Sequence, residues 1–481
     1  MNQIFFLFGL YGFGVFLGLL YKGKLPAPLI GISGFLWGTL LWVLGGMVLL
    51  TAGIPYTPLN MLVYFIILGI GVVVLHVRNK TWSLSRREVT SLLLSAGLFL
   101  LTLLLANTFN YSTTSQDSIA QISTGKRLAY EGLSTLVIEE LSLRGIFLSL
   151  LQSASVFLEV DYLHLLQPGF SITFLLVFFT LPRRIVSHLL SDQRRALIYA
   201  LLTSLALFST YFIVFQFFYV HNSLISAGYL YLAVASFWLG AQEENHCWMV
   251  PGVVALLGFS LARNEAPIFA LIFLILVISA DRTPYQTRLR TILPYLSLVI
   301  VWYAYLLARM GSGTKILNPE KTLVIIASLA ACGALVLISK QEWVQRWLLP
   351  YLPQLMLGGL ALLLAAMVII KPGHMMISVW ITIRNTFEVG GWGIAWPLFG
   401  FLFALSLAGP RVPGEKLFFY GIWSFLLLLV GIVFFRNPFR LGWGDSGNRM
   451  LTHILPITVL YISMKAAQGS TLKEPTTSRG S

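Results

Sequence analysis

Long apolar runs separated by short polar segments dominate this sequence, and they most constrain its fold. A helix needs about 20 apolar residues to cross a bilayer. Inside lipid the backbone has to satisfy its own hydrogen bonds, which for runs of this length favours helices. The sequence therefore predicts an all-α polytopic membrane protein with about 15 transmembrane helices. The runs lie at 2–21, 28–50, 60–77, 89–107, 163–181, 196–216, 222–240, 247–262, 265–280, 291–309, 321–339, 350–370, 392–408, 417–435 and 448–466.

Composition agrees with this prediction. Only 10% of the residues are charged, whereas soluble domains have about 25%. The basic residues are scattered between the apolar runs, which argues against nucleic acid as a partner. The first run has no basic residue ahead of it, so it lacks the charged region of a signal peptide and is expected to be retained as a span.

Basic residues lie mostly in alternate loops, which orients the spans by the positive-inside rule. With the N-terminus outside, the inside loops hold 20 of the 32 Lys and Arg residues. The loops at 78–87, 183–195 and 282–290 are the clearest, while the loop at 242–246 is acidic where a basic loop is expected. The pattern places these loops in the cytoplasm and residues 108–162 outside.

The segment 145–158 decides this topology. It is apolar but short, and it contains Gln152, Ser153 and Ser155. If it crossed the membrane, every later loop would change sides and the Arg-rich loop at 183–195 would face out. We therefore expect an interfacial or re-entrant helix on the outer face, within an external loop at 108–162 that also holds an amphipathic helix at 118–130.

Three stretches in a fixed order carry a family resemblance. The external loop reads NYSTTSQDSIAQISTGKRLAYEG and then LSLRGIFLSLLQSASVFLEVDYLHLL. GFSLARNEAPIFALIFLIL is a span that ends in Arg-x-Glu and turns straight back, and RNPFRLGWGDSGNRMLTHILPI opens a late span. Together they resemble GT-C-type glycosyltransferases, integral membrane enzymes of the protein mannosyltransferase or aminoarabinose transferase type.

This resemblance implies a GT-C-like transmembrane catalytic module at 89–466. Additional N-terminal transmembrane helices at 1–88 would precede it, and a polar tail at 467–481 would follow. The implied reaction is an inverting transfer of a sugar from a polyprenyl-phosphate-linked donor to an acceptor glycan, lipid or protein. It would take place on the external face of a bacterial or archaeal plasma membrane, with membrane lipids as further partners.

Asp117 is the first acid after the fourth span. The resemblance implies that such a carboxylate takes the acceptor proton, a role worth roughly 10²–10⁴-fold in rate. The alternative is an N-cap of the helix at 118–130, because Asp is a favoured N-cap residue. Both roles stay open, and they can coexist.

Several bases are candidates for binding the lipid phosphate of the donor, because arginine bonds two phosphate oxygens at once. Arg449 and His453 are four residues apart and would share one helix face. Arg263 and Glu265 interrupt an apolar stretch, where charge is usually paired and functional; a local Arg–Glu turn is the alternative. The remaining donor candidates are Arg440, Lys126 and Arg127. For the bases of this group a solvated or headgroup-facing position is the competing interpretation.

Two further groups are weaker. Lys371, His374 and Arg384 precede Gly390 in an expected external loop that could shape the acceptor or donor site, as could Glu265. Glu159 and Asp161 spell an acidic E-x-D pattern, which the resemblance links to metal binding, although two solvated residues at a helix end explain it more simply. No cofactor is certain, and a divalent metal stays open.

Competing functions remain. A transporter or flippase of lipid-linked glycans would place its polar residues near the membrane midplane on broken helices, whereas the acids here gather in one loop. An outer-face glycan ligase or polymerase would typically concentrate its bases in one large late loop. A non-catalytic scaffold would leave Arg263 and the late arginines unexplained.

Overall fold

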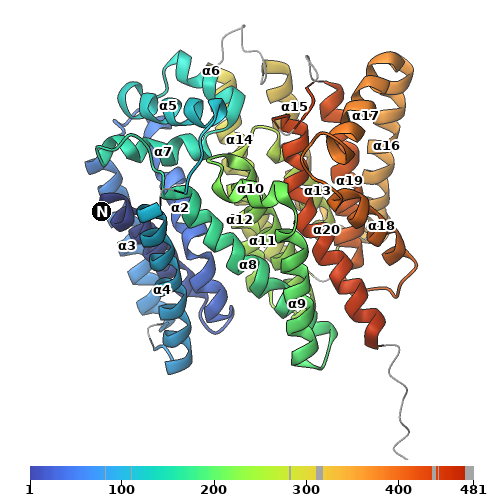
Figure 1. The fold of residues 1–481 in the computed structure, drawn as a ribbon, viewed down its shortest axis with the longest axis horizontal. Helices are drawn as coiled ribbons and strands as arrows, with labels where there is room; N and C mark the ends of the chain where they lie inside the picture. Colours follow the sequence, from blue (N-terminus) through green and yellow to red (C-terminus); the bar gives the residue numbers. More distant parts are fainter. Residues whose placement is uncertain are drawn as a thin grey trace, which may run out of the picture.

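The computed structural model describes residues 1–81, 83–109, 111–280, 283–309, 318–435, 440–442 and 444–471. Within these ranges the secondary structure is helical, without a β-strand. Figure 1 shows long helices running side by side, with a layer of short helices across one end of the bundle. The predicted all-α polytopic membrane fold is confirmed.

The helix bounds follow the chain in four groups. The first group is α1 (Asn2–Gly18), α2 (Ala27–Thr51), α3 (Pro58–Asn79) and α4 (Arg86–Phe109). The short helices are α5 (Gln116–Glu131), α6 (Thr135–Arg144) and α7 (Phe147–Phe157). The middle group is α8 (Leu166–Leu189), α9 (Gln193–Phe208), α10 (Tyr211–Phe218), α11 (Asn222–Gln242), α12 (Met249–Ala262), α13 (Ala266–Ser279) and α14 (Tyr285–Arg309). The last group is α15 (Pro319–Ile338), α16 (Leu352–Ile370), α17 (Pro372–Phe387), α18 (Ala395–Leu407), α19 (Glu415–Phe434) and α20 (Ser446–Thr471).

Every predicted apolar run lies in a helix, but the runs differ in length. Eleven helices of the described residues are long and apolar enough to cross a membrane, or twelve if α9 and α10, bent by 78°, form one broken span. The other three runs form α12, α13 and α18, with 14, 14 and 13 residues. At about 1.5 Å per residue, each falls short of a hydrocarbon core about 30 Å thick. The expected 15 apolar helices are present, and three of them are too short to be full spans.

The predicted external loop folds as a compact layer. Its helix α7 has 11 residues and does not span. It packs beneath α5, where a Cβ on Gly125 would lie 2.5 Å from the Ser149 carbonyl oxygen, so the two backbones are in close contact. Gln152, in α7, accepts from the Leu163 amide at 2.8 Å. α7 is thus too short to span, as expected, and it is buried among protein, where Gln152 and Ser153 find hydrogen-bond partners.

Contacts along α11 fix which loops share an end of the bundle; the end that carries α5, α6 and α7 is named the α5 face. Val220, just before α11, accepts a hydrogen bond from Ser118 of α5. At the other end of α11, Arg184 Nε lies 2.7 Å from Glu243 Oε1, and His188 Nε2 lies 3.0 Å from the same oxygen. The basic segment at 183–195, which begins in the last turns of α8, is therefore opposite the α5 face, and Arg184 pairs with Glu243 of the unexpectedly acidic segment at 242–246.

The C-terminal end of the described chain continues the last helix. Residues 467–471 of the expected polar tail form the last turn of α20, and 472–481 lie outside the described residues. Helices α3 and α16 lie at the two edges of the bundle (Figure 1). Only 11% of the residues in the apolar stretch of each are buried, compared with 94% for α11. Their exposed apolar faces suit contact with lipid.

We expect the α5 face to be outside and the opposite end to be in the cytoplasm. After replacement of Cys247 and Cys332, a cysteine at Tyr130, which is 76% exposed on α5, should react with a membrane-impermeant maleimide on intact cells. A cysteine at Gln193 should react only after permeabilisation. The reverse pattern would invert the topology and remove the basis for an external site.

Candidate functional site

One ion pair joins the N-terminal ends of α5 and α20 at the α5 face. Arg449 Nη1 donates a hydrogen bond of 2.7 Å to Asp117 Oδ2, across 332 residues of sequence. The Arg449 side chain is 8% exposed and that of Asp117 is 38% exposed. The carboxylate is therefore the accessible member of the pair, and the guanidinium lies beneath it.

The position of Asp117 within α5 excludes one of its two predicted roles, that of the N-cap residue. Ser115 is the N-cap residue, the helix begins at Gln116, and Asp117 lies in its first turn. Its carboxylate bonds the distant Arg449 side chain. The N-cap interpretation of Asp117 is wrong, because the helix starts earlier than the expected 118–130.

The start of α5 is anchored to the segment that links α10 and α11. The Thr113 amide donates to the Phe218 carbonyl at 2.7 Å, and the Val220 amide donates to the Thr113 carbonyl at 3.1 Å. Ser118 Oγ donates to the Val220 carbonyl at 2.6 Å. These bonds set the direction of the first turn of α5, and with it the location of the Asp117 carboxylate.

The turn between α12 and α13 supplies a second buried arginine. Arg263 donates from Nε and Nη2 to Glu265 Oε1 at 2.9 and 2.6 Å. Asn264 Nδ2 donates to the carbonyls of Leu141 and Ser142 at the end of α6, at 2.9 and 2.7 Å. The local Arg–Glu pair expected as the alternative is thus present, with the Arg263 side chain 9% and that of Glu265 28% exposed.

The junction of α6 and α7 brings a third arginine to the same place. Arg144 pairs with Glu140 one turn earlier, as the spacing of four predicts. Its carbonyl accepts from Asn222 Nδ2 at 3.3 Å. The next residue, Gly145, has φ +80°, and a Cβ there would lie 2.8 Å from the Ala262 carbonyl oxygen. A side chain at position 145 would therefore separate this junction from the α12–α13 turn.

These charges act on the pKa of Asp117. Partial burial raises this pKa, but the charge and hydrogen bond of Arg449 lower it. The charges of Arg144 and Arg263 act in the same direction as Arg449, and together they hold the pKa below its ordinary value. Asp117 is therefore a carboxylate at neutral pH.

Each arginine of the site has a carboxylate partner: Asp117 for Arg449, Glu265 for Arg263 and Glu140 for Arg144. The site nevertheless has spare donors. Arg449 Nε and Arg263 Nη1 are buried and have no hydrogen-bond partner among the described residues. An unpaired buried donor costs about 1–3 kcal/mol, so these N–H groups have unused capacity for a hydrogen-bond acceptor.

His453 lies one helical turn deeper than Arg449, as the spacing predicts. It is 1% exposed. Its ring meets Phe259 and Phe425 edge-on, at 5.6 and 6.5 Å between centroids. Neither ring nitrogen has a partner within the described part of the chain. His453 is therefore a second source of unused polar atoms beneath the ion pair.

The start of α20 is held by its neighbours. Asn448, directly before Arg449, donates from Nδ2 to the Gly390 carbonyl at 2.9 Å and accepts from the Trp392 indole. The backbone N–H of Asn448 donates to Asp445 Oδ2 at 2.9 Å. The loop between α17 and α18 thus fixes the first turn of α20 and the starting point of the Arg449 side chain.

Sequence analysis missed His221 at this site. It is the N-cap residue of α11 and is 6% exposed. Burial lowers its pKa well below the ordinary value, and the charges of Arg449, Arg263, His453 and Arg144 add to this effect. The available signal was a His-Asn pair at the outer start of a span.

We call Asp117, Arg449, Arg263, Arg144, His453 and His221 the ion-pair cluster. Three donor candidates lie outside it. Arg127 pairs with Glu131 one turn further along α5, at 3.1 Å, and Lys126 precedes it on the same helix. The Arg440 side chain is exposed, and its carbonyl accepts from Asn385 Nδ2 at 3.1 Å. Within the described ranges no hydrogen bond or ion pair joins any of them to Asp117 or Arg449. Arg436, another base of the late run, lies outside the described residues.

The candidates from the 371–391 loop form helix α17 and are used elsewhere. His374 Nε2 bonds the Phe434 carbonyl at 2.7 Å. Arg384 Nε lies 2.8 Å from Glu388 Oε2, and Lys371 is exposed at the start of the helix. Their role in an acceptor or donor site stays a prediction without a structural link to the ion pair.

Glu159 and Asp161 are both exposed in the turn after α7. Across the described residues, no three His, Cys, Asp or Glu side chains gather in a way that could hold a metal ion. The E-x-D pattern therefore has no further ligand beside it in that part of the chain.

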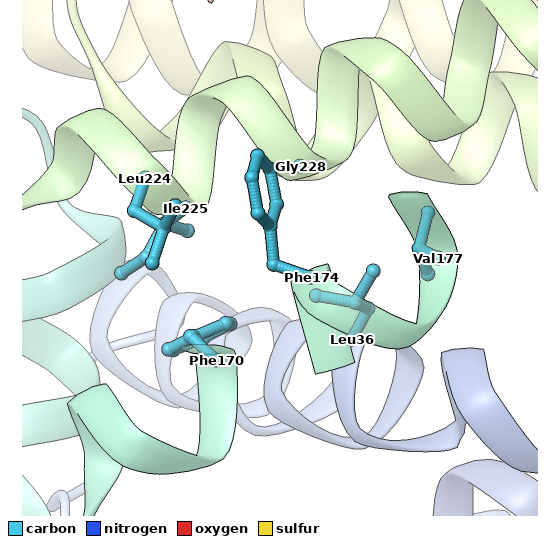
Figure 2. A pocket seen from close by; sticks show the side chains of 7 residues that line it. All are labelled: Leu36, Phe170, Phe174, Val177, Leu224, Ile225 and Gly228. Carbon is cyan, nitrogen blue, oxygen red and sulfur yellow. The ribbon is translucent and has the colours of Figure 1, made fainter. Parts of the chain in front are cut away.

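Figure 2 shows a pocket between α2, α8 and α11. Its lining is apolar, from Leu36, Phe170, Phe174, Val177, Leu224, Ile225 and Gly228. The Phe174 ring lies against α11, where a Cβ on Gly228 would be 2.7 Å from it. A pocket without polar groups cannot bind a sugar or a phosphate through hydrogen bonds, so the ion-pair cluster is the better candidate.

Comparison with known proteins gives only a weak likeness. No protein-family model and no curated protein matches the chain. Among solved structures, it is similar to the Archaeoglobus fulgidus oligosaccharyltransferase tethered with an acceptor peptide containing the NVT sequon via a disulfide bond. Identity is 16% and the TM-score 0.38, over 67% of this chain and 41% of that one. This chain thus spans about two fifths of that protein's length, and a likeness at this TM-score carries no conclusion about site or chemistry.

Proposed function

We propose that this protein transfers a sugar from a polyprenyl-phosphate-linked donor to an acceptor at the outer face of the membrane. The observation that carries the proposal is the Asp117–Arg449 pair, together with the buried N–H groups of Arg449 Nε and Arg263 Nη1 that have no partner among the described residues. A carboxylate and unused cationic donors are the two components that such a transfer needs from the protein.

Asp117 is the proposed general base. As the attacking oxygen or nitrogen of the acceptor forms its bond to the sugar, the carboxylate takes the acceptor's proton. The carboxylate is partly exposed, so an acceptor can approach it from the α5 face. We choose Asp117 because it pairs with Arg449, whereas Glu265 pairs with Arg263 and Glu140 with Arg144. A single displacement with inversion at the sugar carbon is the simplest reaction for one such base.

Arg449 and Arg263 are the proposed phosphate-binding residues. When the sugar leaves, negative charge grows on the phosphate, and fixed positive groups in a buried site stabilise it. Arg449 Nε and Arg263 Nη1 can each donate to a phosphate oxygen without breaking their present bonds. His453 lies at the base of the same site and is available to a further oxygen of the donor.

The proposal is tested with purified protein in nanodiscs, a panel of polyprenyl-phosphate-linked sugars labelled in the sugar, and a membrane extract of the native cell as acceptor source. Label should appear on an extract component, with release of free polyprenyl phosphate. In proteoliposomes, transfer of intact donor across the bilayer without release of polyprenyl phosphate would contradict the proposal and favour a flippase.

The pH dependence of transfer should follow the lowered pKa of Asp117. A base whose pKa is depressed stays ionised as the pH falls, so the acid limb should lie below the ordinary pKa of an aspartate. Removing a lowering charge in Arg144→Gln should move this limb to higher pH. Arg127→Gln, on the same helix as Asp117, is the matched control and should not move the acid limb. Identical limbs in the wild type and Arg144→Gln would contradict the assignment.

A further inference from the structure

We propose that His221 contacts the substrate directly, by donating its Nε2–H to a phosphate oxygen of the bound donor. The inference rests on the proposed function and adds a residue to it that the sequence pattern did not indicate. It follows from the tautomer of the ring, from its fixed orientation and from its neighbours.

Hydrogen bonding fixes the tautomer. The Ser223 backbone N–H donates to His221 Nδ1 at 3.1 Å, and the Ser223 hydroxyl lies 2.8 Å from the same nitrogen. A backbone amide can only donate, so Nδ1 has to be the acceptor. In a neutral imidazole the proton is then on Nε2. Within the described residues this Nε2–H has no partner.

Stacking fixes the ring plane. The His221 ring lies parallel to that of Tyr219, with 5.3 Å between centroids and 4° between planes. The Tyr219 hydroxyl is hydrogen-bonded to Ser115, the N-cap residue of α5. Nδ1 faces the first turn of α11, so the Nε2 edge is directed away from that turn.

The residues on either side place His221 at the site. Val220 accepts from Ser118, one residue after Asp117, and Asn222 donates to the Arg144 carbonyl. The imidazole is therefore held between the first turn of α5 and the end of α6. These are the elements that carry the proposed base and the third arginine.

The ligand that fits is an anionic oxygen. Arg449 Nε and Arg263 Nη1 are buried without a partner among the described residues, and no hydrogen bond joins His221 Nε2 to any of those residues. A sugar hydroxyl brings its own donor, whereas an ionised phosphate oxygen only accepts, as an ionised carboxylate does. Burial lowers the pKa of His221 well below its ordinary value, and the groups facing it from α20 (Arg449 and His453), the α12–α13 turn (Arg263) and the end of α6 (Arg144) act in the same direction, so His221 is neutral at neutral pH.

Two substitutions test the Nδ1 acceptor and the Nε2–H donor of the ring separately. His221→Asn keeps an oxygen that can accept from the Ser223 amide but removes the Nε2–H donor. His221→Gln places an amide N–H near the Nε2 position and gives up the cap. The control is His164→Asn, a histidine of the same external layer that lies outside the cluster. Binding of a polyprenyl monophosphate and of the matching polyprenol is titrated in nanodiscs, with a thermal melt for each variant.

We expect His221→Asn to weaken binding of the polyprenyl monophosphate about tenfold, with polyprenol binding unchanged. His221→Gln should stay within about threefold of the wild type, and His164→Asn should match it. Wild-type affinity in the Asn variant, or equal losses in Asn and Gln, would overturn the role of His221 alone. A wild-type protein that binds the phosphate no better than the polyprenol would overturn the proposed phosphate site and this inference with it.

Discussion

Asp117→Asn is expected to reduce sugar transfer by roughly 10²–10⁴-fold, the contribution of a positioned general base. The amide keeps the size of the side chain but cannot accept the acceptor's proton. Since Ser115 is the N-cap residue of α5, the substitution leaves the cap unchanged. A large loss of rate would therefore report on the chemistry of the carboxylate.

Donor binding in Asp117→Asn should be retained or strengthened. The substitution removes the negative partner of Arg449, which leaves more of the guanidinium charge for the phosphate. The measurement is turnover and donor affinity in nanodiscs, with Glu131→Gln as the matched control on the same helix, because Glu131 pairs only with surface groups, Arg127 and Ser134. A fully active Asp117→Asn protein would refute the base role.

Arg449→Ala is expected to weaken donor binding by about 10–100-fold, which corresponds to the loss of a charge-assisted hydrogen bond. Turnover should fall as well, because the leaving phosphate loses a stabilising charge. Arg449→Lys keeps the charge and loses the planar fork, so it should lie between the wild type and the alanine variant.

Arg440→Ala is the matched control for this series, since Arg440 precedes the same helix but its side chain is exposed. It should bind donor almost as the wild type does. Unchanged donor affinity and turnover in Arg449→Ala would mean that Arg449 only fastens α20 to α5. The proposed phosphate site would then have to centre on Arg263, which keeps an unused buried donor.

The first two predictions are coupled through one contact. In the present structure Arg449 Nη1 is bonded to Asp117, while Nε is free of partners among the described residues. A donor phosphate that binds Arg449 shares the positive charge with Asp117, and this weakens the effect that lowers the Asp117 pKa. Donor binding should therefore make Asp117 a stronger base, which favours binding of the donor before proton transfer.

The helices of this protein could be predicted from the sequence alone. A long apolar run in lipid has to satisfy its backbone internally, and the α-helix does so with local bonds. The same reasoning placed Arg449 and His453 on one helix face, because their spacing of four is a local property. The non-spanning nature of 145–158 also followed from length and charge balance.

The site itself depended on the tertiary structure. Asp117 and Arg449 are 332 residues apart, and neither local sequence contains information about the other. His221 gained its place because the α10–α11 link pairs with the start of α5. Arg127 and Arg384 were also candidates in sequence, yet each pairs with a glutamate one turn away on a partly exposed surface. Local periodicity determines which residues form helices, while the packing of distant helices decides which charges are buried together. Among the donor candidates of the described residues, Arg449 and Arg263 each keep a buried N–H group without a partner.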